Sequence, residues 1–416
     1  MKFEFISNAC GIFHGSKKTK ILCDPWVVNK VFEGSWFNYP PLKTQIKDLQ
    51  EVDAIYLSHV HPDHYDERNF NFPKKIPIII LNEGPNFLKK NLIKKGYNNF
   101  IEIKNNETKS FKEFDLTLYK PFSKHIYEES LLGNLIDSAL VIKENDIVAI
   151  NFNDNTPDDK ACIELNKKFG KIDLALMNYN AAGPYPSCFD NFSETEKKAE
   201  HDRILRRNFD HLCNTIPLLK PKSVLPFAGA YVIGGKNYKK NNYLGTTTWD
   251  MCADYLEKNL KFKTNIFCLN ENQIFDIASL KREGNYHKIS MAHMNDYIEK
   301  IKNEKYDYEL DEDPCVKKLE EDIRIASIRL KERTDRFKIM LKSNVYLNFN
   351  GKKIKILSGI EKNYNLFCSL DNRLLRRILD KKSHWNNAEI GTHISFKREP
   401  NKMDPDVHTM MSFFHI

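Results

Sequence analysis

The sequence predicts an α/β protein of layered sheets and helices, followed by a smaller α+β domain. Three observations favour this fold class. Short β-branched and aromatic segments recur through residues 1–288, helical segments interleave with them, and from about residue 290 the chain becomes highly charged with helical spacing. We therefore expect a first domain over residues 1–288. An accessory domain that begins with a charged helical region is expected over residues 289–416.

Each element is predicted from its hydrophobic spacing and from the turn residues around it. In the first domain we expect strands within 1–7, 19–27, 52–59, 74–82, 100–104, 108–121, 138–154, 172–180 and 220–231. Helices are expected near 84–96 and over about 193–219. In the second domain we expect a helical region over 290–341 and short strands within 344–357 and 364–379.

Composition excludes several functional classes. The 416 residues carry 64 basic and 56 acidic side chains, a net charge of +8 that is spread along the chain. This modest excess permits an anionic small-molecule substrate but does not indicate nucleic-acid binding. No segment approaches the roughly 20 apolar residues of a membrane span. Nine cysteines without a CxxC pair favour a reducing compartment, so we expect a cytoplasmic protein without a membrane partner.

The segment "IYLSHVHPDHYDERNF", residues 55–70, carries the strongest functional signal. His59 and His61 follow a predicted strand at a spacing of two, which places them on one side. Asp63 and His64 stand on a turn begun by Pro62 and can face a second position nearby. Imidazole and carboxylate are ligands for zinc, manganese or iron. The cluster therefore predicts a divalent metal site, with Asp63 also placed to orient a water molecule or accept its proton.

The pattern HxHxDH after "DAIYLSH", with an earlier "DPW" strand, resembles the metallo-β-lactamase superfamily. More narrowly, the chain resembles the metallo-β-lactamase-like part of CMP-N-acetylneuraminate hydroxylase. The supporting segments are "ILCDPWV", "GSWFNYPP", "VDAIYLSHVHPDH", "LALMNYNAAGPYP", "PKSVLPFAGAYV" and "HWNNAEIGTHISFKREP". The resemblance covers most of residues 1–240 and part of the C-terminal region. It implies an αββα sandwich with one or two metal ions at an edge of the sheets.

The resemblance also implies further site residues. His125 is expected as a third ligand beside His59 and His61, and Asp154 as a ligand that bridges two ions. A surface histidine and a turn-forming aspartate are the alternatives. Asp24 is expected either to orient a ligand histidine or to form a simple turn with Pro25. The segment "LPFAGAYVIGG" has no histidine where a late ligand is usual, so one ion and two ions both stay open.

Substrate contacts are expected from two loops that combine small and aromatic residues. The residues are Tyr179, Gly183, Tyr185, Gly229 and Tyr231. A sugar or base could lie against such side chains, although the glycines and prolines of these loops also suit plain turns.

Two functions from different chemical classes follow. The first is a metal-dependent hydrolase that activates water, with zinc as the first expectation and iron or manganese as alternatives, acting on a sugar or nucleotide-sugar such as a sialic-acid derivative. The second is a non-heme iron hydroxylase that acts on a CMP-sialic-acid-like sugar. The sequence has no CxH…CxxH pair for a Rieske cluster, so the oxidative alternative needs electrons from a separate partner. A binding module without activity is a third interpretation, which the complete His/Asp cluster disfavours.

Overall fold

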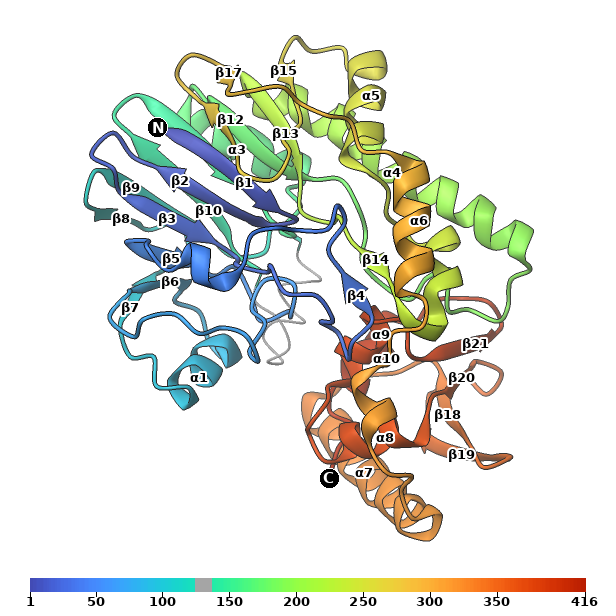
Figure 1. Cartoon of the computed structure of the whole chain (residues 1–416). Helices are drawn as coiled ribbons and strands as arrows, with labels where there is room; N and C mark the ends of the chain where they lie inside the picture. Colours follow the sequence, from blue (N-terminus) through green and yellow to red (C-terminus); the bar gives the residue numbers. More distant parts are fainter. Residues whose placement is uncertain (124–136) are drawn as a thin grey trace.

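Two β-sheets form the centre of the N-terminal part of the chain (Figure 1). The structure is a computed structural model and describes residues 1–123 and 137–416. In the first sheet the described strands lie in the order β17 (Lys281–Arg282), β16 (Gln273–Asp276), β1 (Lys2–Ser7), β2 (Cys10–His14), β3 (Lys20–Cys23), β5 (Ala54–Tyr56), β6 (Ile78–Leu81) and β7 (Phe100–Ile103). In the second they lie in the order β15 (Asn265–Ile266), β13 (Ser223–Phe227), β12 (Leu174–Asn178), β11 (Ile147–Asn151), β10 (Ala139–Glu144), β9 (Phe114–Tyr119) and β8 (Thr108–Phe111).

The two sheets pack face to face through buried aromatic side chains. Phe3 and Phe5 of β1 contact Phe227 of β13, with ring centroids 5.7 and 6.1 Å apart. All three side chains are at most 4% exposed and belong to one large hydrophobic cluster. Such burial of apolar area is the main favourable term in folding.

Helices cover the outer faces of both sheets. On the first sheet, Leu88 and Leu92 of α1 (Phe87–Lys94) pack against the strands. On the second, the described helices are α3 (Asp159–Phe169), α4 (Glu194–Leu219) and α5 (Trp249–Asn259). The helix α4 begins where Ser193 and Glu196 form a capping box. This αββα arrangement confirms the predicted fold class.

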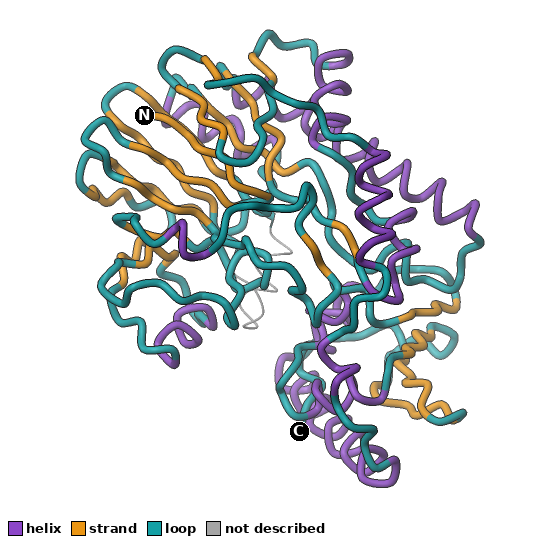
Figure 2. Tube along the Cα trace, viewed as in Figure 1, coloured by secondary structure: helices purple, strands orange, loops and turns teal. Residues whose placement is uncertain are grey.

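The C-terminal part combines helices with a further sheet (Figure 2). Its buried side chains form a second hydrophobic cluster, which Cys188 and Phe189 of the N-terminal part also join. Its described sheet has the order β19 (Lys352–Leu357), β18 (Asn344–Phe349), β20 (Asn365–Ser369) and β21 (Ser395–Glu399). Its helices are α7 (Val316–Phe337), α8 (Asn372–Leu379), α9 (Trp385–Ile390) and α10 (Pro405–Met411). The boundary at residues 288 and 289 stays a prediction. Next to it, Ile298 and Ile301 of α6 (Met291–Ile301) pack on the N-terminal part.

Shorter elements complete the described chain. These are β4 (Trp36–Phe37), which pairs with β14 (Val232–Ile233), and the 3-10 helices η1 (Ile46–Leu49), η2 (Gly235–Tyr243) and η3 (Asp307–Leu310). No helix among the described residues is long and apolar enough to cross a membrane.

Three differences from the predicted elements have a common physical origin. The helices α3 and α5 were not predicted, and residues 372–379, predicted as strand, form α8. In α8 the buried side chains are Leu374, Leu375, Ile378 and Leu379, a helical spacing. Short apolar segments fit both a strand and a buried helix, and packing decides between them.

Candidate metal centre

The histidine cluster lies where strands of both sheets end. The strand β5 leads directly into Ser58 and His59, β3 ends just before Asp24, and β11 ends just before the loop with Asp154. Because these strand ends meet at one edge of the sandwich, residues far apart in sequence face one point. Asp24 has φ 40° and sits in the left-handed region, which Asp and Asn tolerate better than most residue types.

One group of candidate ligands consists of His59, His61 and Asp154. The Nε2 atom of His59 lies 3.0 Å from Nδ1 of His61 and 3.9 Å from Oδ2 of Asp154. One ligand atom from each residue falls within 4.8 Å of the others. This spacing suits a single divalent ion bound by two imidazoles and a carboxylate.

A second group consists of Asp63, His64 and the same Asp154. The Nε2 atom of His64 lies 3.5 Å from Oδ2 of Asp63 and 3.4 Å from Oδ2 of Asp154. One carboxylate oxygen of Asp154 therefore faces both groups. This arrangement has the geometry of a bridging ligand between two ions.

Each histidine has one ring nitrogen in the cluster and a polar partner on the other nitrogen. Nδ1 of His59 lies 2.9 Å from Oγ of Ser58 and 3.2 Å from Oδ1 of Asp137. Nδ1 of His64 lies 3.0 Å from Oδ2 of Asp24. Nε2 of His61 lies 2.9 Å from Oδ1 of Asn386. Such outer partners fix the tautomer and orientation of metal-bound imidazoles.

The residues fit a metal ion. Nε2 of His64 is buried and makes no hydrogen bond among the described residues, and the two carboxylates near it stand beyond normal hydrogen-bond distance. A buried nitrogen without a hydrogen bond is costly unless another group occupies its lone pair. Imidazole and carboxylate are ligand types that zinc, iron and manganese all use.

Burial and mutual charge shift the pKa of every group in the cluster. Burial lowers the pKa of His59 and lowers that of His61 to about 4. Burial alone would also lower the pKa of His64, but the carboxylates of Asp63, Asp154 and Asp24 raise it well above its usual range. Burial raises the pKa of Asp63 to about 7. The buried carboxylates thus need a positive charge beside them, which a divalent ion would also supply.

Comparisons with known proteins give related sequences and related structures. No family model matches the chain. A Mycolicibacterium smegmatis protein whose name assigns it to the Rieske 2Fe-2S iron–sulfur proteins is 30% identical over 224 residues, which is 53% of this chain and 42% of that protein. The cytidine monophosphate-N-acetylneuraminic acid hydroxylase of Danio rerio is 23% identical, over 55% of this chain and 38% of the hydroxylase. The chain spans less than half the length of these relatives.

Two solved structures share part of the backbone arrangement. CmlA, a diiron β-hydroxylase from Streptomyces venezuelae, has a TM-score of 0.45 and 14% identity over 66% of this chain and 53% of its own. A possible metal-dependent hydrolase from Veillonella parvula also has a TM-score of 0.45, with 17% identity over 66% of this chain and 98% of its own.

About half of the chain is similar in sequence to cytidine monophosphate-N-acetylneuraminic acid hydroxylases and to proteins named as Rieske iron–sulfur proteins. The resemblance predicted from the sequence is confirmed. The His/Asp cluster provides two groups of candidate ligands for a metal ion.

The edge of the two-sheet sandwich brings together most of the predicted ligands. His59, His61, Asp63, His64 and Asp154 lie in the two groups described above. His125, the remaining predicted ligand, lies outside the described residues.

The predicted substrate residues do not line the cavity beside the metal centre. Tyr179 is 1% exposed within the main hydrophobic core, and its contact with a substrate stays a prediction. The hydroxyl of Tyr185 donates to Oε2 of Glu200 at 2.6 Å, and its ring packs on Phe189. The loop that carries these tyrosines therefore supports the C-terminal part.

The three other predicted substrate residues are also placed away from this cavity. Gly183, with φ 151°, has open space around its Cα. The backbone NH of Gly229 donates to Oδ1 of Asn8. Tyr231 is 5% exposed and stacks on Trp36, with ring centroids 3.3 Å apart. Tyr231 lines a smaller, separate cavity, and the role of these residues in substrate binding stays a prediction.

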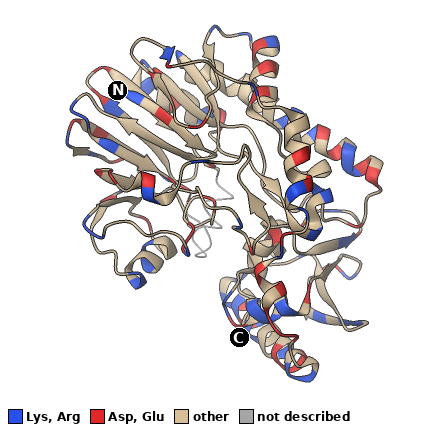
Figure 3. Ribbon diagram, viewed as in Figure 1, with Lys and Arg blue, Asp and Glu red and all other residues tan. Residues whose placement is uncertain are grey.

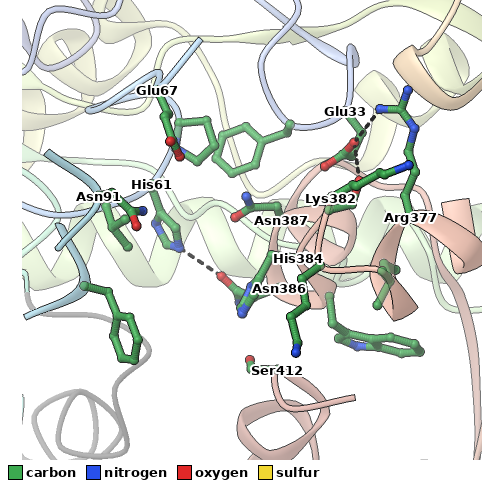
Figure 4. Close-up of a pocket in the computed structure, with 18 of the residues that line it drawn as sticks. Glu33, His61, Glu67, Asn91, Arg377, Lys382, His384, Asn386, Asn387 and Ser412 are labelled. Atoms are coloured by element: carbon green, nitrogen blue, oxygen red, sulfur yellow. Dashed lines mark hydrogen bonds and ion pairs between the residues drawn. The ribbon is translucent and has the colours of Figure 1, made fainter. Parts of the chain in front are cut away.

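A cavity of about 640 Å³ opens beside the cluster instead. The cavity lies between the histidine loop and the segment that joins α8 to α9, and His61 lies on its wall (Figure 4). The cavity could not be predicted from the sequence, because its opposite wall comes from Asp307 and from residues 377–415, far along the chain from the histidine loop.

Sequence analysis also missed several residues that support the ligands. Nδ2 of Asn8 lies 3.4 Å from Oδ2 of Asp63, and Nδ2 of Asn178 lies 3.2 Å from Oδ1 of Asp154. Ser58 donates from its backbone NH and its hydroxyl to Asp24, both at 2.8 Å. A serine or asparagine at a strand end is common without any site nearby. No sequence signal distinguished these residues.

Proposed function

We propose that this protein is a metal-dependent hydrolase that cleaves an anionic sugar or nucleotide-sugar substrate. The observation that carries this proposal is the position of Asp154, whose Oδ2 atom faces both ligand groups at 3.4 and 3.9 Å. A two-ion centre supplies an activated water and a clamp for the attacked and leaving oxygens.

The chain's own groups then have distinct tasks. His59 and His61 would hold one ion, Asp63 and His64 the other, and Asp154 both. Asp63 would orient the attacking water or accept its proton, because its Oδ2 atom faces the centre and is held by Asn8. The buried imidazoles exclude bulk water from the inner side.

The cavity beside His61 is the proposed substrate site. Lys94 of α1 and Lys381 and Lys382 after α8 stand on its wall and have no ion-pair partner among the described residues. Among the acidic side chains of the same cavity, Glu33 and Asp307 contact Arg377 and Arg68, and Asp66 also contacts Arg68. Glu67 is the fourth acidic side chain of the lining, against five lysines and arginines. The small positive excess would favour a phosphate or carboxylate group. Figure 3 shows basic and acidic side chains interspersed over the C-terminal part.

A second candidate is a non-heme iron hydroxylase that acts on a CMP-sialic-acid-like sugar. The sequence similarity to cytidine monophosphate-N-acetylneuraminic acid hydroxylases and to proteins named as Rieske iron–sulfur proteins supports it. The His and Asp donors also suit paired iron. Because the sequence has no CxH…CxxH pair for a Rieske cluster, this alternative needs electrons from a separate partner protein.

Metal analysis and two assays on one preparation separate the candidates. The protein is purified without added metal, its metals are measured, and it is tested for hydrolysis of CMP-sialic acid and related activated sugars, and for oxygen uptake with a reductant. Zinc or manganese with product release supports the hydrolase, whereas iron with reductant-dependent oxygen uptake overturns it in favour of the hydroxylase. H61A should lose metal and activity, while H293A, which removes an exposed histidine of α6, should keep both.

A further inference from the structure

The segment "HWNNAEIGTH", residues 384–393, contributes to the sequence resemblance, but no site residue was predicted in it. In the structure it forms α9 and the turn after it, on the C-terminal side of the cavity. Its Asn386 points across the cavity toward His61 (Figure 4). Oδ1 of Asn386 lies 2.9 Å from Nε2 of His61, a contact between residues 325 positions apart.

This contact decides which nitrogen of His61 can bind a metal ion. An amide oxygen only accepts hydrogen bonds, so Nε2 of His61 must carry the proton. Nδ1 of His61 then keeps its lone pair and faces Nε2 of His59, 3.0 Å away. His59 and His64 have the same division between an outer partner and an inner ligand nitrogen. Asn386 thus occupies for His61 the position that Asp24 occupies for His64.

The helix α9 is held firmly enough to act in this way. Trp385 is 1% exposed, and its Nε1 donates to Oε1 of Glu389 at 2.7 Å. Nε1 of Trp36 in the N-terminal part donates to the carbonyl of Ile390 at 3.3 Å. Beyond α9, Nε2 of His393 donates to the carbonyl of Phe32 at 2.9 Å. The helix is therefore fixed to both parts of the chain.

We propose that Asn386 is a positioning residue of the metal centre, through which the C-terminal part completes the site from the cavity side. This inference rests on the proposed function, because it assumes that His61 binds a metal ion. Asparagine supplies an acceptor without adding a further negative charge to a site that already holds several buried carboxylates.

Metal affinity tests the proposal directly. Wild type, N386A, N386D and the neighbouring control N387A are freed of metal and titrated with Zn²⁺ against a chromophoric chelator and with Co²⁺ by visible absorption. N386A should bind one of the two ions about 10–100-fold more weakly and change the Co²⁺ spectrum. N386D keeps an acceptor and should recover most of the affinity, and N387A should bind as wild type does. The melting temperature of the metal-free N386A protein should stay that of wild type.

The outcomes separate this inference from the proposed function. If wild type binds zinc or cobalt tightly and N386A binds the same ions with wild-type affinity, the inference is overturned and the proposed function stands. If N386D is as weak as N386A, or if metal-free N386A melts at a much lower temperature, Asn386 serves packing instead and the inference is overturned. A wild-type protein that binds no ion overturns both.

Discussion

Asp24 and His64 form a buried pair in which Oδ2 of the aspartate lies 3.0 Å from Nδ1 of the histidine. Both side chains are fully buried. Asp24 also accepts two hydrogen bonds from Ser58, so its carboxylate is fixed on several sides. The pair directs Nε2 of His64 toward Asp63 and Asp154 and thereby sets the direction of the second ligand group.

D24N should therefore weaken binding of the ion held by Asp63, His64 and Asp154 about 10–100-fold, because the amide is a poorer acceptor for the imidazole NH. Competition titration with a chelator measures this. The matched control is D53N. Asp53 lies just before β5 and forms an ion pair with Lys112 near the surface, away from the cluster, so this variant should bind metal as wild type does. Equal affinity of D24N and wild type for both ions would contradict this role.

Asp154 faces both ligand groups, so D154A should reduce binding of two ions at once. H64A removes a ligand from only one group and should leave about one ion bound. Elemental analysis after dialysis gives the stoichiometries. D159A removes an exposed aspartate from the first turn of α3 and should bind metal as wild type does. Loss of a single ion in D154A would exclude the bridging position.

The sequence predicted the ligand cluster because all four of its residues lie within a six-residue segment after a strand. The period of a strand and the donor types of His and Asp were enough to indicate a metal site. Asp154 and Asp24 were identified only by resemblance, because each lies on a different strand end. The fold class followed from the alternation of strands and helices in the same way.

The support of the site could not be predicted. Asn386 and Asn8 reach the cluster only through tertiary contacts, Asn386 to His61 over 325 positions and Asn8 to Asp63 over 55. The cavity could not be predicted from the tyrosines of the loops either, since an aromatic residue next to a turn suits a core as well as a binding site. Tyr179 is such a core residue.

The structural constraint on Gly229 was also not visible in the local sequence. It has φ +114°, and an added Cβ would lie 2.7 Å from Cβ of Asn180. G229A should lower the free energy of unfolding by about 1–3 kcal/mol, through backbone strain and this contact. Urea unfolding of the metal-free protein measures the change.

The matched control for Gly229 is G183A, which has φ +151° and nothing within 4 Å of an added Cβ. It reports backbone strain alone, so the difference between the two variants reports the contact with Asn180. Gly229 also donates to Asn8, which holds Asp63. G229A should therefore weaken metal binding, whereas G183A should not. Equal loss of stability in both variants would argue against a close contact at Gly229.

His408 should make stability depend on pH. Nδ1 of His408 lies 2.9 Å from Oε1 of the buried Glu389. Burial alone would lower the pKa of His408, and Arg398 also lowers it. The carboxylate of Glu389, with a smaller contribution from Asp404, nevertheless raises it above its usual range. The folded-state pKa thus exceeds the unfolded value of about 6.5, so this stabilisation is complete below that pH and is lost as the pH rises through the folded-state pKa.

H408Q should therefore lower the free energy of unfolding by roughly 1–3 kcal/mol at pH 5.5 and by much less at pH 9, because only the protonated imidazole gives a charged hydrogen bond. Urea unfolding in the presence of a chelator measures this without any contribution from metal binding. H293Q, at an exposed position of α6, should show the same small change at both values. An equal effect of H408Q at both pH values would mean that the imidazole acts by packing on Phe396. Because Glu389 also accepts from Trp385, loss of the charged pair should loosen α9 and weaken the hold of Asn386 on His61.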